Sequence, residues 1–174
     1  MSEPVPAPAE ALPFDLRAFF FEPWRGWGVA CDPFGAPVGR FEARGQGHVV
    51  DGRTRLDQTL TFDSGLVQTL EWEILADEGG ALTAREHRSG ALAEGRQTSD
   101  GFRWVARMKA PTPIGMRTVK IESLYSMART GEAHAVTTIS LWGFRLSTAS
   151  VEYRQLAAPQ GSDRPGGFTA PLAA

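Results

Sequence analysis

Apolar and polar residues alternate along most of the chain between Trp24 and Arg154. Within residues 38–50, Phe41 and Ala43 fall on one side of the segment and charged residues fall on the other. This period of two is typical of β-strands that bury one face. The pattern predicts strands at 24–31, 38–50, 53–62, 66–76, 81–88, 91–98, 102–110, 118–127, 133–142 and 144–154.

Turn-forming residues separate these segments. The chain has Asp-Pro-Phe-Gly at 32–35, Asp-Gly at 51–52 and Asp-Ser-Gly at 63–65. Such sequences between alternating segments are strong hairpin signals, so consecutive strands are expected to pair antiparallel. Residues 111–115 contain two prolines, which predicts a loop that could form part of a barrel mouth.

Glycines favour a closed sheet over a flat one. Gly45 and Gly47 interrupt the segment 38–50, and glycine inside a strand usually marks a bulge or a sharp bend. A short helix is expected within residues 14–21, ending before Pro23, and its aromatic side chains would plug one end of a barrel or cover an edge. Cofactor stacking is the alternative for these aromatics. The chain therefore predicts an all-β fold, an up-and-down antiparallel barrel of about eight to ten strands or a related sandwich.

Composition and length fit a single domain. The 174 residues are 42% hydrophobic and 22% charged, which suits one globular β-barrel over residues 14–154. Residues 1–13 are rich in Pro and Ala and are expected to form a flexible N-terminal segment. Residues 155–174 are rich in Pro, Gly and Ala without periodicity, which predicts a disordered C-terminal tail.

Charge and hydropathy exclude several partners. The formal charge of −2, from 18 basic and 20 acidic residues, gives no field that would by itself recruit nucleic acid or an anionic membrane. No apolar stretch approaches the roughly 18 residues that a membrane-spanning helix needs, and no secretory signal is recognisable. A soluble, cytoplasmic protein is expected. An incompletely closed barrel would leave an edge strand for a second copy to cover, so a homodimer is possible.

The predicted inward face is rich in aromatic residues, and two interpretations of it stay open. One is a filled aromatic core; the other is a cavity for a small apolar or amphipathic ligand, since barrels of this size hold side chains or one small molecule. Gln68, Ser123 and Tyr125 would orient the polar end of such a ligand. The predicted ligand-binding residues are Trp27, Phe41, Leu60, Phe62, Gln68, Trp72, Trp104, Met108, Tyr125 and Trp142.

Motifs of catalysis are absent from the sequence. There is no Gly-x-Ser-x-Gly, Cys-x-x-Cys or His-Glu-x-x-His motif, and the single cysteine, Cys31, cannot make a disulfide or a zinc site by itself. No catalytic residue, metal or cofactor is assigned. The alternative function is an isomerase- or cyclase-type enzyme acting on a lipid in the same cavity, with Glu86 or Tyr125 as acid or base. An inward Glu86 would have a raised pKa, although a paired structural charge is the simpler interpretation. A purely structural barrel is the third hypothesis.

Several motifs resemble those of a bacterial family of domains of unknown function over roughly residues 19–153. They include Gly-Trp-Gly at 26–28, the turn at 32–35, Phe-Asp-x-Gly at 62–65 and Trp72. The resemblance implies a lipocalin-like, calycin-type barrel. It also implies relatives that are mostly small lipoproteins, loosely implicated in lipid or modified fatty-acid metabolism.

Some positions depart from the family pattern. Gln58 replaces an acidic residue, Leu70 replaces an Arg, and Ala135 and Leu141 replace an Asn and a Lys. The run Glu-Ser-Leu-Tyr at 122–125 stands where relatives tend to have Asp-Asp-Trp-Met. These losses of polar groups weaken any transfer of an enzymatic role. Cys31 lies within a predicted strand and not in a lipobox, so no lipid anchor is expected.

Overall fold

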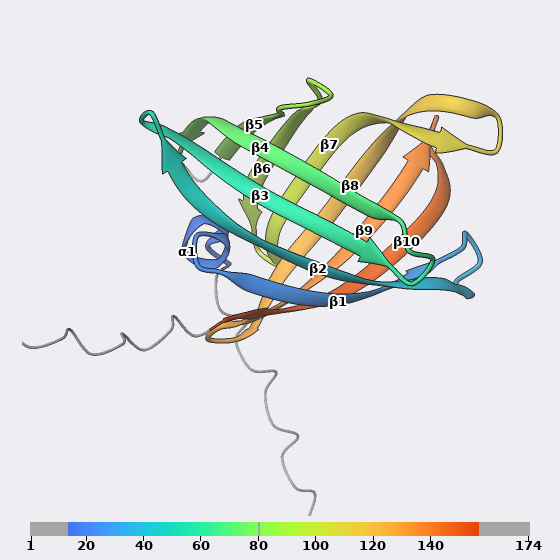
Figure 1. Ribbon diagram of the computed structural model, residues 1–174, viewed down its shortest axis with the longest axis horizontal. Coiled ribbons are helices and arrows are strands. Elements are labelled where there is room, and N and C mark those ends of the chain that lie inside the picture. The colour runs from blue at the N-terminus through green and yellow to red at the C-terminus, as the bar shows by residue number, and fades with distance from the viewer. Residues whose placement is uncertain (1–13, 80, 157–174) are drawn as a thin grey trace, which may run out of the picture.

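The computed structural model describes residues 14–79 and 81–156, which form one short helix and ten strands (Figure 1). The elements are α1 (Leu16–Phe20), β1 (Trp24–Cys31), β2 (Pro37–Val50), β3 (Arg53–Phe62), β4 (Val67–Glu78), β5 (Ala81–Glu86), β6 (Leu92–Thr98), β7 (Gly101–Thr112), β8 (Gly115–Arg129), β9 (Glu132–Leu141) and β10 (Phe144–Gln155). The predicted flexible segment 1–13 and most of the predicted tail, 157–174, lie outside the described residues.

The strands form a closed, up-and-down antiparallel barrel. Each strand pairs with its neighbours in the chain, and β1 also pairs with β10, from Trp24 opposite Gln155 to Cys31 opposite Thr148. The predicted fold class is therefore confirmed. Pairing of β1 with β10 closes the barrel, although one side of β7 has no neighbouring strand beyond Arg107. The homodimer stays a prediction.

The up-and-down order gives the barrel two different ends. The β1–β2, β3–β4, β5–β6, β7–β8 and β9–β10 turns lie at one end, here called the open end. Helix α1 and the remaining turns lie at the other, the closed end; Figure 1 shows α1 at the left and the β1–β2, β3–β4 and β7–β8 turns at the right.

Helix α1 plugs the closed end, as its aromatic residues predicted. Asp15 caps the helix, its Oδ1 accepting a hydrogen bond from the Ala18 amide at 3.0 Å. Gln155 Nε2 donates to carbonyl oxygens near the end of α1, which ties the helix to β10. The helix buries Phe20, whose ring centroid lies 5.1 Å from that of Trp24.

Glycines on the inward face make room for aromatic rings. A Cβ atom at Gly28 would lie 2.2 Å from Cζ of Phe41, and one at Gly45 would lie 2.5 Å from the Trp24 ring. The sequence predicted a bulge or a sharp bend at Gly45 and Gly47. The β2–β3 register is continuous through both, which excludes the bulge, and the sheet does close into a barrel. These glycines instead accept a neighbouring side chain, as glycines paired with aromatic residues across strands often do.

The predicted loop at 111–115 is shorter in the structure, a turn at residues 113–114 at the open end. Strand β7 runs to Thr112 and β8 begins at Gly115, with Pro111 paired opposite Met116. Strand β6 pairs with β7 only as far as Arg107, so one side of β7 has no neighbour beyond that residue. A proline, which lacks the N–H group, is tolerated on such an unpaired edge.

Two tryptophans predicted to face inward do not. Trp27 is 47% exposed on the outer wall, where the Arg25 guanidinium lies 5.0 Å from its ring centroid, because Gly26 and Gly28 occupy the inward positions of β1. Trp142 is 73% exposed in the β9–β10 turn, with φ of 53°. The alternating pattern placed both residues inward, whereas the inward positions beside Trp27 hold glycine and Trp142 lies in a turn outside the strands.

Candidate ligand-binding cavity

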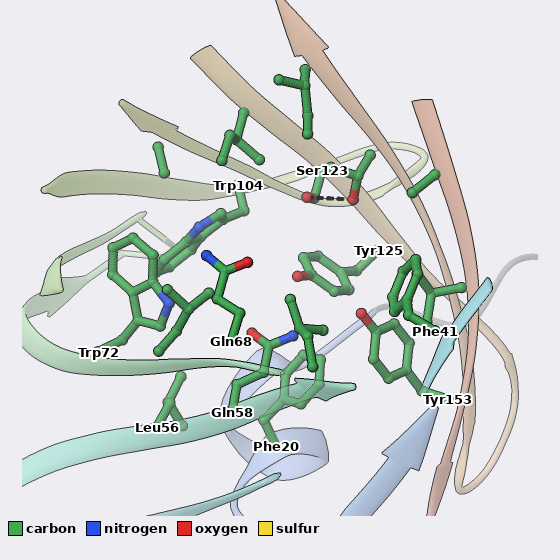
Figure 2. Close-up of a pocket in the computed structure, with 18 of the residues that line it drawn as sticks. Phe20, Phe41, Leu56, Gln58, Gln68, Trp72, Trp104, Ser123, Tyr125 and Tyr153 are labelled. Carbon is green, nitrogen blue, oxygen red and sulfur yellow. Dashed lines mark hydrogen bonds between the residues drawn. The ribbon is translucent and has the colours of Figure 1, made fainter. Parts of the chain in front are cut away.

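A cavity of about 250 Å³ lies inside the barrel between α1 and the open end. Its base includes Leu16 and Phe20 of the helix with Tyr125 and Tyr153 of the wall (Figure 2). Gln68 lines the cavity and is also exposed to solvent, so the cavity reaches the surface near the start of β4. The α1 plug therefore leaves access from the open end.

Most of the predicted ligand-binding residues are brought together here. The structure places in the cavity lining Phe41, Leu60, Phe62, Gln68, Trp72, Trp104, Met108 and Tyr125. Trp27 and Trp142 lie outside it. The aromatic interior is thus packed at the closed end and hollow towards the open end, which combines the two interpretations that the sequence left open.

Paired aromatic rings form one wall. The ring centroids of Trp72 and Trp104 are 5.2 Å apart with their planes at 89°, an edge-to-face contact between β4 and β7. Both side chains are buried and border the cavity. Rings held in this way supply a fixed apolar surface for a ligand.

Two side-chain amides enter the cavity from adjoining strands. Gln58 on β3 and Gln68 on β4 both line it, and Figure 2 shows their amides directed into the space below Trp104. In the described part of the chain, neither amide has a hydrogen-bond partner. Gln58 is half-buried and Gln68 is exposed to solvent, so the donors and acceptors of both amides are available to a ligand or to water.

Hydroxyl groups form the opposite polar side. Ser123 Oγ lies 2.8 Å from Thr137 Oγ1, so these two groups satisfy each other. Burial raises the pKa of Tyr125 to about 12, although hydrogen bonding to Ser123 and Tyr153 opposes part of that rise. Burial and the neighbouring Tyr125 also raise the pKa of Tyr153 well above its usual value. Both tyrosines therefore stay neutral at physiological pH and can donate hydrogen bonds.

Glu86 does not belong to the cavity. Its side chain is buried, but Oε1 accepts from the Glu71 amide at 3.2 Å, and Oε2 accepts from both the amide and the hydroxyl of Ser89 at 2.6 Å. Burial acts to raise the pKa of Glu86, but these hydrogen bonds outweigh it and the pKa is lowered. The predicted raised pKa is wrong: Glu86 is a structural carboxylate that fixes the β5–β6 turn.

The cavity is consequently neutral. Among the described residues, no Asp, Glu, Lys, Arg or His contributes to its lining. No group of three or more His, Cys, Asp or Glu side chains in residues 14–79 and 81–156 is arranged to hold a metal ion. None of the helices in the described part of the chain has the length and apolarity to cross a membrane.

Sequence reasoning missed several lining residues. Leu16 and Phe20 reach the cavity only because the helix folds into the barrel, which no local pattern reveals. Tyr153 falls on a period-two face of its strand. The signal that its ring points into the barrel was Gly26, which lies opposite Tyr153 and leaves room for the ring. Gln58 was noted only as a departure from the family pattern.

Comparison with solved structures supports the fold alone. A crystal structure of a protein of unknown function from the DUF3598 family of Nostoc punctiforme matches with a TM-score of 0.57 and 12% identity, covering 86% of this chain. The chain spans about half of that protein, 52% of its length. The ywiB protein of Bacillus subtilis gives a TM-score of only 0.34 at 12% identity, over 78% of this chain and 93% of that one.

Comparison at the sequence level identifies the family. None of the curated proteins compared with the chain matches it. The model of a family described as a protein of unknown function, DUF3833, matches residues 6–155. This match spans most of the chain and nearly the whole barrel. The chain therefore belongs to the DUF3833 family.

Proposed function

We propose that this protein is a calycin-like binding protein that holds one small amphipathic, lipid-like molecule inside the barrel. The observation that carries the proposal is the pair of unpartnered amides, Gln58 and Gln68, in a cavity whose other lining side chains are apolar or aromatic apart from the hydroxyl groups opposite them. Ligand sites commonly combine an apolar wall with a few polar groups that fix orientation.

The size of the cavity limits the ligand. A volume of about 250 Å³ accommodates roughly eight groups of the size of a water molecule or a methylene, at about 30 Å³ each. A medium-length acyl chain or a small ring system fits this space, with a polar end at Gln58 or Gln68. A longer chain would extend past Gln68 to the open end.

The neutral lining favours binding over catalysis. The enzyme alternative relied on Glu86 or Tyr125 as acid or base. Glu86 lies outside the cavity with a lowered pKa, and Tyr125 has its pKa raised to about 12, far from the range in which general acids and bases work efficiently. The predicted cytoplasmic location remains part of the proposal, and fractionation of the native protein tests it.

A fluorescence titration tests the proposal. An environment-sensitive fatty-acid probe should bind saturably and alter tryptophan emission, since Trp72 and Trp104 border the cavity. Ala106 is buried and lines the same space, so Ala106→Leu should fill part of it and weaken probe binding at least about tenfold. Val105→Leu adds bulk on the outer side of the same strand and should leave binding unchanged.

Replacing the two amides tests whether they hold the polar end of the ligand. Gln58→Leu combined with Gln68→Leu should weaken binding of a carboxylate- or hydroxyl-bearing probe and spare an all-hydrocarbon probe of the same size. Loss of a hydrogen bond to a ligand costs about 1 kcal/mol, or roughly fivefold in affinity, per amide. Absence of saturable binding by any probe, in a protein whose near-ultraviolet circular dichroism shows a packed interior, would reject the binding function.

A further inference from the structure

The turns of the open end expose large apolar side chains. They lie in or beside the β1–β2, β3–β4, β7–β8 and β9–β10 turns and are Phe34, Val38, Leu66, Val67, Ile114, Met116, Trp142 and Phe144. Phe34 is 94% exposed and Phe144 is 75% exposed. Figure 1 shows the β1–β2, β3–β4 and β7–β8 turns projecting at the same end of the barrel. None of these residues lines the cavity, so they form a separate feature, here called the apolar rim.

The turns of the closed end have a different composition. Asp51-Gly52 joins β2 to β3, Ser99-Asp100 joins β6 to β7, and Thr130-Gly131 joins β8 to β9. Solvent-facing turns normally carry such small and polar residues. Val49 and Val50 beside the β2–β3 turn and Leu156 after β10 are exposed as well, but the exposed aromatic residues of the turns, Phe34, Trp142 and Phe144, all lie at the open end. Such a cluster marks an interaction site.

Basic side chains accompany the apolar rim. A shallow surface pocket beside it is lined by Arg107, Thr118, Lys120, Ser140, Trp142 and Gly143. In the described part of the chain, no acidic side chain pairs with Arg107. Arg40, Lys109, Arg117 and Arg145 lie in the same half of their strands.

Acidic side chains near the apolar rim are mostly engaged within the protein. The Asp32 carboxylate accepts hydrogen bonds from the amides of Phe34 and Ala36, both at 2.9 Å. Asp63 accepts one from the Arg40 amide at 3.1 Å. The carboxylates thus shape the turns. Among the basic side chains, Lys120 pairs with Glu122, and Arg117 and Arg145 donate to the carbonyl oxygens of Met116 and Pro33, which leaves the Arg107 guanidinium as the one without an acidic or carbonyl partner among these four described residues. This part of the surface is both apolar and cationic.

The β9–β10 turn holds a tryptophan where the backbone disfavours one. Trp142 and Gly143 have φ of 53° and 87°, the left-handed pair of a two-residue hairpin turn. The β2–β3 turn uses Asp51 and Gly52 with nearly the same angles, 51° and 74°. Asn or Asp is preferred at the first position, and a bulky residue there is strained. Strain of this kind persists mainly at functional positions.

We propose that the open end docks on the surface of a bilayer that contains anionic phospholipid. The apolar rim enters the interface, with Trp142 at the headgroup level, and Arg107 and Lys120 contact lipid phosphates. Tryptophan favours that level because its ring is apolar and its N–H group is polar. Basic residues beside an apolar face are the usual companions of interfacial binding.

The basic residues beside the apolar rim favour an anionic lipid surface over a second copy of the chain as its partner. A symmetric dimer through the apolar rim would place the same surface patch on both sides of the contact. Arg107, Lys109 and Arg117 of one copy would then approach those of the other, and like charges across an interface are unfavourable. An anionic lipid surface is complementary to the same patch. The proposal concerns the rim and does not depend on what the cavity holds.

Vesicle co-sedimentation tests this docking. The full chain should bind vesicles made of equal parts phosphatidylcholine and phosphatidylglycerol at least about tenfold more strongly than phosphatidylcholine vesicles, and added salt should weaken binding. Trp142→Asn should reduce partitioning by roughly fivefold or more without unfolding the protein, because Asn accepts the left-handed turn. Arg107→Gln should reduce it by about fivefold, the effect of one basic residue near an anionic surface.

Matched controls lie away from the apolar rim. Trp27→Ala removes another exposed tryptophan from the outer wall, and Arg96→Gln removes an exposed basic residue from the closed-end half of β6. Both should bind vesicles as the unaltered protein does. Absence of vesicle binding, or binding equally reduced by the rim and control variants, would overturn the proposal. A dimer in solution that Trp142→Asn converts to monomers would overturn it in favour of self-association.

Discussion

The closed and open ends of this barrel use the same two-residue turn with different residues. Asp51-Gly52 at the closed end suits its left-handed backbone, whereas Trp142-Gly143 at the open end places an exposed indole on it. The aromatic residues of the closed end are packed: Phe14, Phe19 and Phe20 lie in one buried cluster. Aromatic residues thus stabilise one end, while at the other they are available for binding.

From this comparison we expect the largest loss of stability when an aromatic ring is removed from the closed end. Trp24→Ala should lower the free energy of unfolding by about 3 to 5 kcal/mol, because the buried ring packs against Phe20 and Tyr153 and fills the space above Gly45. Chemical denaturation measured by circular dichroism would give this value. A loss below about 1 kcal/mol would show that the α1 plug is loosely packed, and it would contradict the view that aromatic residues stabilise the closed end.

We expect the next largest loss of stability when Glu86 is replaced, and this loss should depend on pH. Glu86→Ala should cost about 2 to 3 kcal/mol, since the amides of Glu71 and Ser89 would lose a buried acceptor. The pKa of Glu86 is lowered on folding, so its stabilising contribution is complete above the ordinary Glu pKa of about 4.3 and is lost as the pH falls through the folded value. Glu86→Gln should flatten the acid limb of the stability curve. An unchanged acid limb would contradict this role.

Replacing Gln58 should have a smaller effect, and it should raise the free energy of unfolding instead of lowering it. Gln58→Leu should raise the stability of the ligand-free protein by about 1 kcal/mol or less, because an apolar side chain replaces a half-buried amide that has no partner within the described residues. The same variant should weaken binding of a polar-headed probe. Thermal unfolding with and without probe separates the two effects. A destabilised ligand-free variant would mean that the amide already has a partner.

Trp142→Asn predicts the smallest change in stability. Relief of the disfavoured backbone should stabilise the protein by about 1 kcal/mol or less. Both variants therefore remove an indole ring, Trp24→Ala from the closed end and Trp142→Asn from the open end. They should change the free energy of unfolding in opposite directions. Differential scanning calorimetry of both variants compares them directly, and a lower melting temperature for Trp142→Asn would show that the indole packs on the protein.

Local patterns were sufficient to predict the barrel. Alternation and Asp-Gly turns located each strand within a few residues, because period two and turn chemistry act over short distances. Contacts between distant segments were harder to foresee. Gly26 and Gly28 hold the inward positions of β1 because the rings of Tyr153 and Phe41 lie over them, and this set Trp27 on the outside.

The candidate site was predicted in part for the same reason. Side chains in regular strands, such as Phe62 and Trp104, follow from the pattern and do line the cavity. The sequence predicts Trp142 within a strand, whereas the structure places it in a left-handed turn that tryptophan rarely occupies. The roles of Phe20 and Gln58 depend on how α1 enters the barrel and on which amides remain unpartnered, which only the three-dimensional structure reveals.

A crystal structure of the protein purified without delipidation would test the central claim most directly. We expect continuous density for a small elongated molecule beside Trp72 and Trp104, with a polar end within hydrogen-bond distance of Gln58 or Gln68. Native mass spectrometry of the same sample should give the matching added mass, and Ala106→Leu should lack it. A cavity that contains only ordered water, or one closed by inward movement of these side chains, would contradict a ligand-binding barrel.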